Sequence, residues 1–186
     1  MIFFSCLMKI CGEMWGIVEE NDYFCIRDSI IIVRMRFLGN IEAKTDAKGR
    51  VFLPATFRKV LQAAGDEVLV MRKDVHQKCL VLYPASTWNR RMDALLERIS
   101  EWDDMGQQVL RQYVSEAEVL TLDGNGRFLI PKRYLQMAEI EQSVRFIGMN
   151  DAIEIWATEK TSEPFLSQEE FSQKLKQIMN SGVKEG

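Results

Sequence analysis

A ten-residue pattern occurs twice in this chain of 186 residues, and no other feature constrains the architecture as strongly. The two segments are TDAKGRVFLP at 45–54 and LDGNGRFLIP at 122–131. Four residues correspond between them at one constant offset: Asp46, Gly49, Arg50 and Pro54 match Asp123, Gly126, Arg127 and Pro131. Such self-similarity predicts that one supersecondary unit is present twice.

The similarity continues beyond the proline and defines the content of the unit. The run 68–71 corresponds to 144–147, and CLVLY at 79–83 corresponds to AIEIW at 152–156, after a short insertion in the first copy around 74–78. Each copy therefore predicts a strand, a glycine turn, a short apolar strand, a helix that the proline opens, and two further strands. The fold class that follows is α+β and mainly β.

Domain limits follow from the repeat and from the segments around it. We expect a first module at 37–87, connecting helices at 88–116, a second module at 117–160 and a C-terminal helix or tail at 161–186. Apolar residues three and four positions apart predict an amphipathic helix from Ser86 to Ile99 and a second around 109–114. Ser167 and Glu170 form a capping box that predicts the start of the tail helix.

Residues 1–34 differ in character from the rest of the chain. They show no sustained helical or strand period, whereas a well-patterned segment begins at Met35. We expect the natural polypeptide to begin at Met35, so that residues 1–34 are an N-terminal extension that is not native. The alternative is that they form an extra strand or helix that packs on the core.

Cysteine usage and hydropathy indicate the compartment. Only Cys79 lies after residue 35, so no disulfide framework is indicated and a cytoplasmic protein is expected. Lys9 interrupts the apolar opening of the chain. The run Ile30–Val33 is far shorter than the roughly 20 residues that span a bilayer, so no membrane segment is predicted.

The repeated arginine is the feature that points to a function. Aspartate and glycine suit a tight turn, because the carboxylate accepts backbone N–H bonds and glycine tolerates positive φ. Turn formation alone does not require arginine at the same place in both copies. Arginine is the residue that binds phosphate or guanine bidentately, which favours a nucleic-acid site at both turns.

The charge distribution allows only a local nucleic-acid site, because the formal net charge is −3. Basic residues surround the first turn against only Glu42 and Asp46: Lys44, Lys48, Arg50, Arg58 and Lys59. The second turn has Arg127, Lys132 and Arg133, but Asn125 replaces Lys48. We expect the two turns to have unequal roles. An ordinary solvated basic face is the alternative.

These motifs together resemble those of the MraZ family of bacterial transcription regulators, from Met35 to about Thr158. The resemblance is carried by DAKGRVFLP, by CLVLYP at 79–84 followed by Trp88, by LDGNGRFLIP, and by IEIW at 153–156. It implies two AbrB/SpoVT swapped-hairpin half-modules that form a double-ψ-like small barrel. It also implies a ring-shaped homo-oligomer in the nucleoid, whose partner is double-stranded DNA. The DNA would carry direct repeats in the promoter of the division and cell-wall operon that contains the protein's own gene.

The resemblance also assigns roles to individual residues. The family's Asp-x-x-x-Arg element falls on Asp46 and Arg50 and on Asp123 and Arg127. Arg50, Lys48, Lys44 and Arg127 are then the expected DNA-binding residues. Asp46, Gly49, Asp123 and Gly126 are the expected turn-organising residues.

Two other classes of function are open to the sequence. We expect no enzyme, no cofactor and no metal site: His76 is the one histidine, no phosphate loop or metal-spaced cluster occurs, and Asp103 and Asp104 resemble a solvated face. The alternative to DNA binding is a non-catalytic protein-interaction or antitoxin-like module. Such a module would use the apolar faces of the 86–99 helix and of the tail helix.

Overall fold

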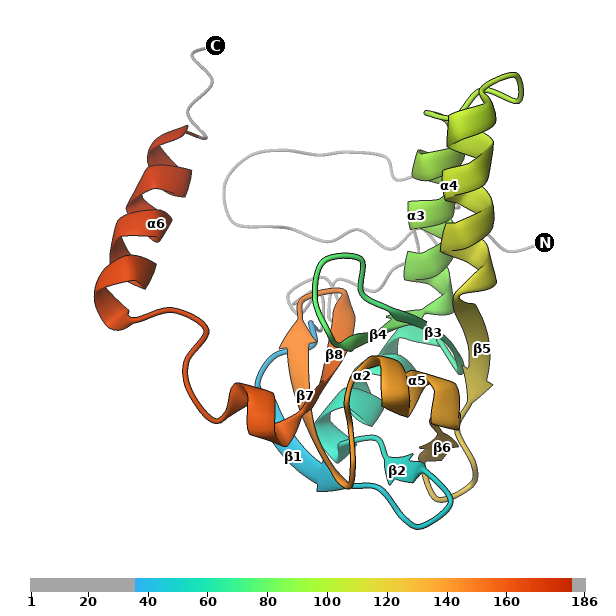
Figure 1. Cartoon of the computed structure of the whole chain (residues 1–186). Helices are drawn as coiled ribbons and strands as arrows, with labels where there is room; N and C mark the ends of the chain where they lie inside the picture. The colour runs from blue at the N-terminus through green and yellow to red at the C-terminus, as the bar shows by residue number, and fades with distance from the viewer. Residues whose placement is uncertain (1–35, 182–186) are drawn as a thin grey trace, which may run out of the picture. The chain divides into compact units, whose positions relative to one another are not determined.

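The two repeats fold into the same order of elements in the part of the chain that this computed structural model describes, residues 36–181 (Figure 1). The first repeat contains β1 (Asn40–Lys44), β2 (Arg50–Phe52), α2 (Ala55–Ala64), β3 (Val68–Lys73) and β4 (Leu80–Pro84). The second repeat contains β5 (Ala117–Thr121), β6 (Arg127–Leu129), α5 (Lys132–Met137), β7 (Ser143–Met149) and β8 (Ala152–Ala157). The expectation for residues 1–34 lies outside the described residues.

The prolines start the helices as predicted, although one position earlier than the first helical turn. Pro54 and Pro131 occupy the N-caps of α2 and α5, with extended backbone angles of φ −52° and ψ 139° and of φ −59° and ψ 146°. The carbonyl of Pro54 accepts the first helical hydrogen bond from the Arg58 N–H at 3.0 Å. Gly65 ends α2 in the left-handed conformation, at φ 70°.

Strand pairing exchanges the first strands of the two repeats. The six-stranded antiparallel sheet has the order β1-β7-β8-β4-β3-β5, so β1 of the first repeat pairs with the second repeat and β5 of the second pairs with the first. The fold is therefore α+β with swapped half-modules, as predicted. Within residues 36–181, β1 and β5 form the two ends of this sheet, and closure into a double-ψ-like barrel stays a prediction.

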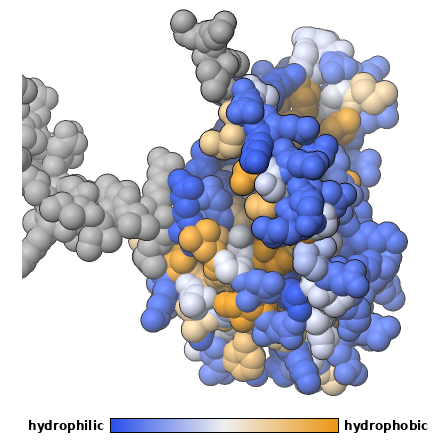
Figure 2. Space-filling model, turned by 90° about the vertical axis from the view of Figure 1, so that its left-hand side faces the viewer, coloured by the Kyte–Doolittle hydropathy of each residue, from blue (hydrophilic) through white to orange (hydrophobic). Residues whose placement is uncertain are grey.

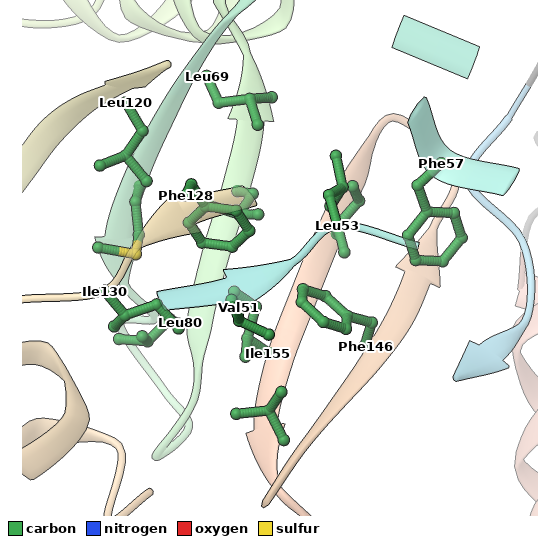
Figure 3. Close-up of a cluster of buried hydrophobic side chains, with 14 of the residues drawn as sticks. Val51, Leu53, Phe57, Leu69, Leu80, Leu120, Phe128, Ile130, Phe146 and Ile155 are labelled. Carbon is green, nitrogen blue, oxygen red and sulfur yellow. The ribbon is translucent and has the colours of Figure 1, made fainter. Parts of the chain in front are cut away.

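A second, two-stranded ladder joins β2 to β6. Its central pair, Val51 and Phe128, is 1% and 3% exposed, and these side chains lie among sheet residues in the core (Figure 3). The Phe128 ring makes an edge contact with Phe146 of β7, at 6.4 Å between ring centroids. Burial of side chains of this size contributes roughly 1.5–3 kcal/mol each and fixes which face of the ladder points inward.

Helices connect and follow the repeats. They are α3 (Ala85–Leu96), α4 (Asp104–Ser115), the short helix η1 (Thr158–Thr161) and α6 (Gln168–Ser181). The capping box at the start of α6 is confirmed, since Ser167 N donates to Glu170 Oε2 at 3.1 Å and Glu170 N donates to Ser167 Oγ at 3.2 Å. The predicted insertion is also confirmed: residues 74–79 join β3 to β4, whereas Asn150 and Asp151 alone join β7 to β8.

The surface of the described chain is mixed. The face drawn in Figure 2 is mostly hydrophilic, with apolar side chains in small separate groups. Every helix between residues 36 and 181 is too short or too polar to span a lipid bilayer.

Candidate nucleic-acid interface

The first turn is held by the carboxylate of Asp46. Its Oδ1 accepts hydrogen bonds from the backbone N–H groups of Lys48 and Arg50, both at 2.9 Å. Its Oδ2 accepts from Arg50 Nε at 2.7 Å. Gly49 completes the turn at φ 82°, a backbone conformation that residues with a Cβ rarely adopt.

The second turn repeats this geometry. Asp123 Oδ1 accepts from the backbone N–H groups of Asn125 and Arg127 at 2.9 Å, and Oδ2 accepts from Arg127 Nε at 2.8 Å. Gly126 has φ 80°. The two aspartate–arginine turns are therefore structural equivalents as well as sequence equivalents.

Each aspartate is stabilised in its ionised form. The backbone N–H of Arg50 is the main cause that lowers the pKa of Asp46 below its ordinary value of 3.8. The backbone N–H of Arg127 does the same for the pKa of Asp123. Both carboxylates consequently carry a full negative charge at neutral pH and orient the arginines beside them.

The hydrogen bonds to the aspartates use only one edge of each guanidinium. Within the described residues, the terminal Nη groups of Arg50 and Arg127 have no hydrogen-bond acceptor. The two side chains are 39% and 28% exposed. Each arginine thus presents two N–H donors side by side, the arrangement that binds guanine O6 and N7 or a phosphate.

Both arginines lie on the outer face of the β2–β6 ladder. Arg50 is directly opposite Leu129, and Arg127 is directly opposite Phe52. All four point away from the core, because the intervening Val51 and Phe128 point inward. The antiparallel register therefore brings the turn arginine of each repeat onto one surface, the ladder face, which consists of Arg50, Phe52, Arg127 and Leu129.

The ladder face also contains two exposed apolar side chains that the sequence analysis assigned no role. Phe52 is 54% exposed and Leu129 is 48% exposed. The Arg127 guanidinium lies 5.5 Å from the centre of the Phe52 ring. The strand period of two was the available signal, since it places alternate residues of the FLP and LIP segments on the outer face.

Backbone hydrogen bonds attach each turn to the other repeat. Leu53 N donates to Gly126 O at 3.0 Å, and Ile130 N donates to Gly49 O at 2.9 Å. A Cβ at Gly49 would meet the Ile130 carbonyl oxygen at 2.8 Å. Each turn is consequently positioned by the opposite half of the protein.

The expected grouping of Arg58 with the first turn is wrong. Its Nη1 donates to Asn125 O at 3.3 Å, and its side chain covers Gly126 so closely that a Cβ there would lie 2.4 Å from Nη1. The corresponding residue of the second repeat, Leu135, covers Gly49 of the first turn. Helix α2 therefore provides a positive charge to the second turn, where Asn125 lacks one.

The remaining basic residues differ in availability. Lys44, Lys48 and Lys59 are exposed, at the end of β1, in the first turn and on α2. Arg133 instead pairs with Glu118 of β5 at 2.7 Å. The lysines beside the first turn can approach phosphates, whereas Arg133 already has an acidic partner.

The residues that an enzyme or a metal site would need lie apart. His76 is exposed in the β3–β4 loop, and Asp103 caps α4 by accepting from Met105 N at 3.2 Å. Within residues 36–181, no group of three or more histidine, cysteine, aspartate or glutamate side chains could hold a metal ion. These residues contribute to loops and helix ends.

Two half-modules that exchange strands, each with an aspartate–arginine turn, define an AbrB-like protein of the α+β class. The chain belongs to the MraZ family, whose model, described as "MraZ protein, putative antitoxin-like", matches residues 36–109 and 113–180.

Individual relatives are similar over most or nearly all of their length. A protein of Phocaeicola vulgatus named Transcriptional regulator MraZ is 59% identical over 147 residues, which cover 79% of this chain and 96% of the relative. A protein of the same name from Bacteroides thetaiotaomicron is 58% identical over 146 residues, 78% of this chain and 94% of the relative. One from Shewanella oneidensis is 32% identical over 120 residues, 64% of this chain and 78% of the relative.

Proposed function

We propose that this chain is a non-catalytic transcription regulator that binds double-stranded DNA in a sequence-specific way. The observation that carries the proposal is the ladder face, where Arg50 and Arg127 lie on one exposed surface and each is oriented through Nε by its own aspartate. A two-stranded β-ribbon fits the major groove, and arginine binds guanine there. The names of the relatives support regulation of transcription as the outcome.

The lysines beside the first turn have a different role in this proposal. Lys44 and Lys48 are exposed, so they suit phosphate contacts that position the ladder without reading sequence. Arg50 and Arg127 would contact base edges. Asp46 and Asp123, with Gly49 and Gly126, would hold the arginines in place.

The target and the assembly follow from the resemblance to the family. We propose that the protein acts in the cytoplasm, at the nucleoid, as a ring-shaped homo-oligomer. Its site would be the direct repeats upstream of the division and cell-wall operon that contains its own gene. Because the chain is acidic overall, several copies of one small basic face provide the affinity that a single copy lacks.

Arg50→Ala tests the proposal directly. We expect it to remove the preference for the upstream DNA over a scrambled duplex, a loss of about 1–3 kcal/mol for one bidentate contact. Arg127→Ala should weaken binding less, since the Arg127 side chain is 28% exposed whereas that of Arg50 is 39% exposed. Fluorescence anisotropy at fixed salt measures both.

Arg111→Ala is the matched control, because it removes the same charge from an exposed position on α4. It should bind as the wild type does. Wild-type affinity in Arg50→Ala, with an unchanged oligomeric state, would contradict the assignment.

Replacement of Lys44 and Lys48 by alanine separates positioning from recognition. Affinity for every DNA sequence should fall, and the slope of log affinity against log salt should decrease by about one for each phosphate that the variant no longer neutralises. The ratio of specific to non-specific affinity should be retained. An unchanged salt slope would place these lysines away from the DNA.

An antitoxin-like protein-binding module is the second candidate, and α6 favours it. This helix is exposed along its length and presents four apolar side chains: Phe171, Leu175, Ile178 and Met179. Absence of binding to the upstream DNA, with Arg50→Ala no different from the wild type, would favour this candidate over DNA recognition.

A further inference from the structure

We infer that Phe52 and Leu129 contact thymine methyl groups, so that the ladder face reads thymine as well as guanine. This inference rests on the proposed function, since it requires that the ladder face enter the major groove. It gives a DNA-contacting role to Phe52 and Leu129, which lie outside the two Asp-x-x-x-Arg elements. Thymine is the base that presents a methyl group in that groove, and an apolar side chain is what recognises it.

Exposure is the first argument. Phe52 and Leu129 are about half exposed, although their neighbours along the same strands, Val51 and Phe128, are almost fully buried. The core therefore gains little from their apolar character. Scattered exposed apolar residues are common on proteins, so the neighbours of Phe52 and Leu129 distinguish them from ordinary surface residues.

Their position relative to the arginines is the second argument. Each apolar residue is directly opposite the arginine of the other repeat, as Arg50 pairs with Leu129 and Phe52 pairs with Arg127. Directly paired residues have Cβ atoms roughly 4.5–5.5 Å apart. Successive bases along a strand are about 3.4 Å apart, so an arginine on guanine would bring its apolar partner over an adjacent base pair.

The charge of the face is the third argument, and it selects DNA as the occupant. An apolar partner protein would bury two guanidinium groups whose Nη donors need acceptors. The major groove satisfies both kinds of side chain, since guanine O6 and N7 accept from arginine and the thymine methyl packs against carbon. Exposed Lys44 and Lys48 beside the first turn suit the phosphates that flank the groove.

The contact between Phe52 and Arg127 links the two kinds of recognition. The ring centre lies 5.5 Å from the guanidinium, and Asp123 binds the Nε edge of the same group. Phe52 therefore has a second role as a positioning residue for Arg127. Loss of the ring should affect both thymine and guanine recognition, whereas loss of Leu129 should affect thymine alone.

The test removes the methyl group from the DNA. Two duplexes of the upstream sequence are compared, one with thymine and one with deoxyuridine at every thymine position, by anisotropy with the full-length protein. The wild type should bind the thymine duplex about fourfold more tightly for each methyl group contacted, the value of roughly one buried methylene. The Phe52→Ser, Leu129→Ser double variant should bind both duplexes equally.

Val119→Ser is the matched control, because Val119 is a 67% exposed apolar residue on the edge strand β5. It should retain the wild-type ratio between the two duplexes. Equal binding of both duplexes by the wild type would overturn the inference, as would a thymine preference that survives in the double variant. Failure of the wild type to bind the thymine duplex at all would instead contradict the proposed function. The wild-type comparison needs no variant, so equal binding of the two duplexes would overturn the inference even if the double variant misfolds.

Discussion

The conformation of the turn glycines explains why both copies contain glycine at this place. Gly49 is at φ 82°, and its missing side chain leaves room for the Ile130 carbonyl oxygen. Alanine would be strained in that conformation and would also displace the backbone of the other repeat. Gly124 has no such restriction, since nothing lies within 4 Å of a Cβ built there, and the first repeat has Ala47 at that place.

Gly49→Ala should therefore lower the free energy of unfolding by more than about 1 kcal/mol. Gly124→Ala should leave it within about 0.5 kcal/mol of the wild type. Urea denaturation monitored by circular dichroism measures both. Equal stability of the two variants would show that the turn tolerates a side chain at Gly49.

Asp46 and Asp123 determine how the turns respond to acid. Their pKa values are lowered in the folded protein, chiefly by the backbone N–H groups of Arg50 and Arg127. The stability that each ionised carboxylate contributes is fully present above the ordinary aspartate pKa of 3.8. It is lost as the pH falls below 3.8 through the lower folded-state pKa.

Comparison of the wild type with Asp46→Asn should show this window. The difference in unfolding free energy between them should be constant from pH 7 to about pH 4.5 and should shrink below pH 3.8. Asparagine keeps an oxygen that accepts backbone N–H bonds but loses the charge that holds Arg50. A difference that grows as the pH falls below about 4.5 would contradict the direction of the shift.

At the scale of the elements, one buried arginine attaches the connecting helices to the sheet. Arg72 of β3 has a side chain that is only 5% exposed, and its guanidinium lies 3.7 Å from the centre of the Tyr113 ring on α4. Tyr113 in turn stacks on Trp88 of α3, with 5.6 Å between ring centroids and 14° between planes. Glu116 Oε2 lies 3.9 Å from Arg72 Nη2 and forms an ion pair with it.

Tyr113→Leu should destabilise the protein by about 2 kcal/mol, because it removes a desolvated cation–π interaction of that order. In the Arg72→Met background the same change should cost clearly less, since no buried charge then needs the ring. A double-mutant cycle by thermal or urea unfolding measures the coupling. Additive effects would mean that the two residues stabilise the fold independently.

The strands and helices could be predicted from the sequence more fully than the packing between them. The repeat and the strand period predicted the strands and helices, because these depend on local pattern. Arg58 was misplaced, since the direction of a side chain from α2 depends on how the helix packs on the other repeat. The ladder face was missed because the pairing of β2 with β6 joins residues far apart in the sequence. The DNA-binding roles of Arg50, Arg127, Lys44 and Lys48 stay predictions, as do the domain limits.

At the scale of the whole molecule, the proposed oligomer should make DNA affinity depend on the number of repeats. Linked sites gain up to roughly 10²–10⁴ in affinity through effective concentration when several identical faces bind together. We expect affinity to rise from duplexes with one repeat to those with two and three. Insertion of half a helical turn should reduce it, since faces on a rigid ring must meet the same side of the duplex, at intervals of about 10–10.5 base pairs. Anisotropy on these four duplexes measures the effect, and equal affinities would exclude multivalent binding.

The differences between the two strand-exchanged repeats give the ladder face a direction. Val51 and Phe128 are equivalent positions and face each other, so a two-fold axis would pass through the centre of the ladder if the repeats were identical. They are not identical, since Lys48 is replaced by Asn125 at one turn and Arg58 by Leu135 beside the other. A symmetric reader contacts a duplex equally in both orientations and suits palindromes. A reader with unlike ends has a polarity along the groove, so it binds each of its sites in one orientation only, and the proposed ring of identical subunits would then require sites in one sense, as direct repeats are.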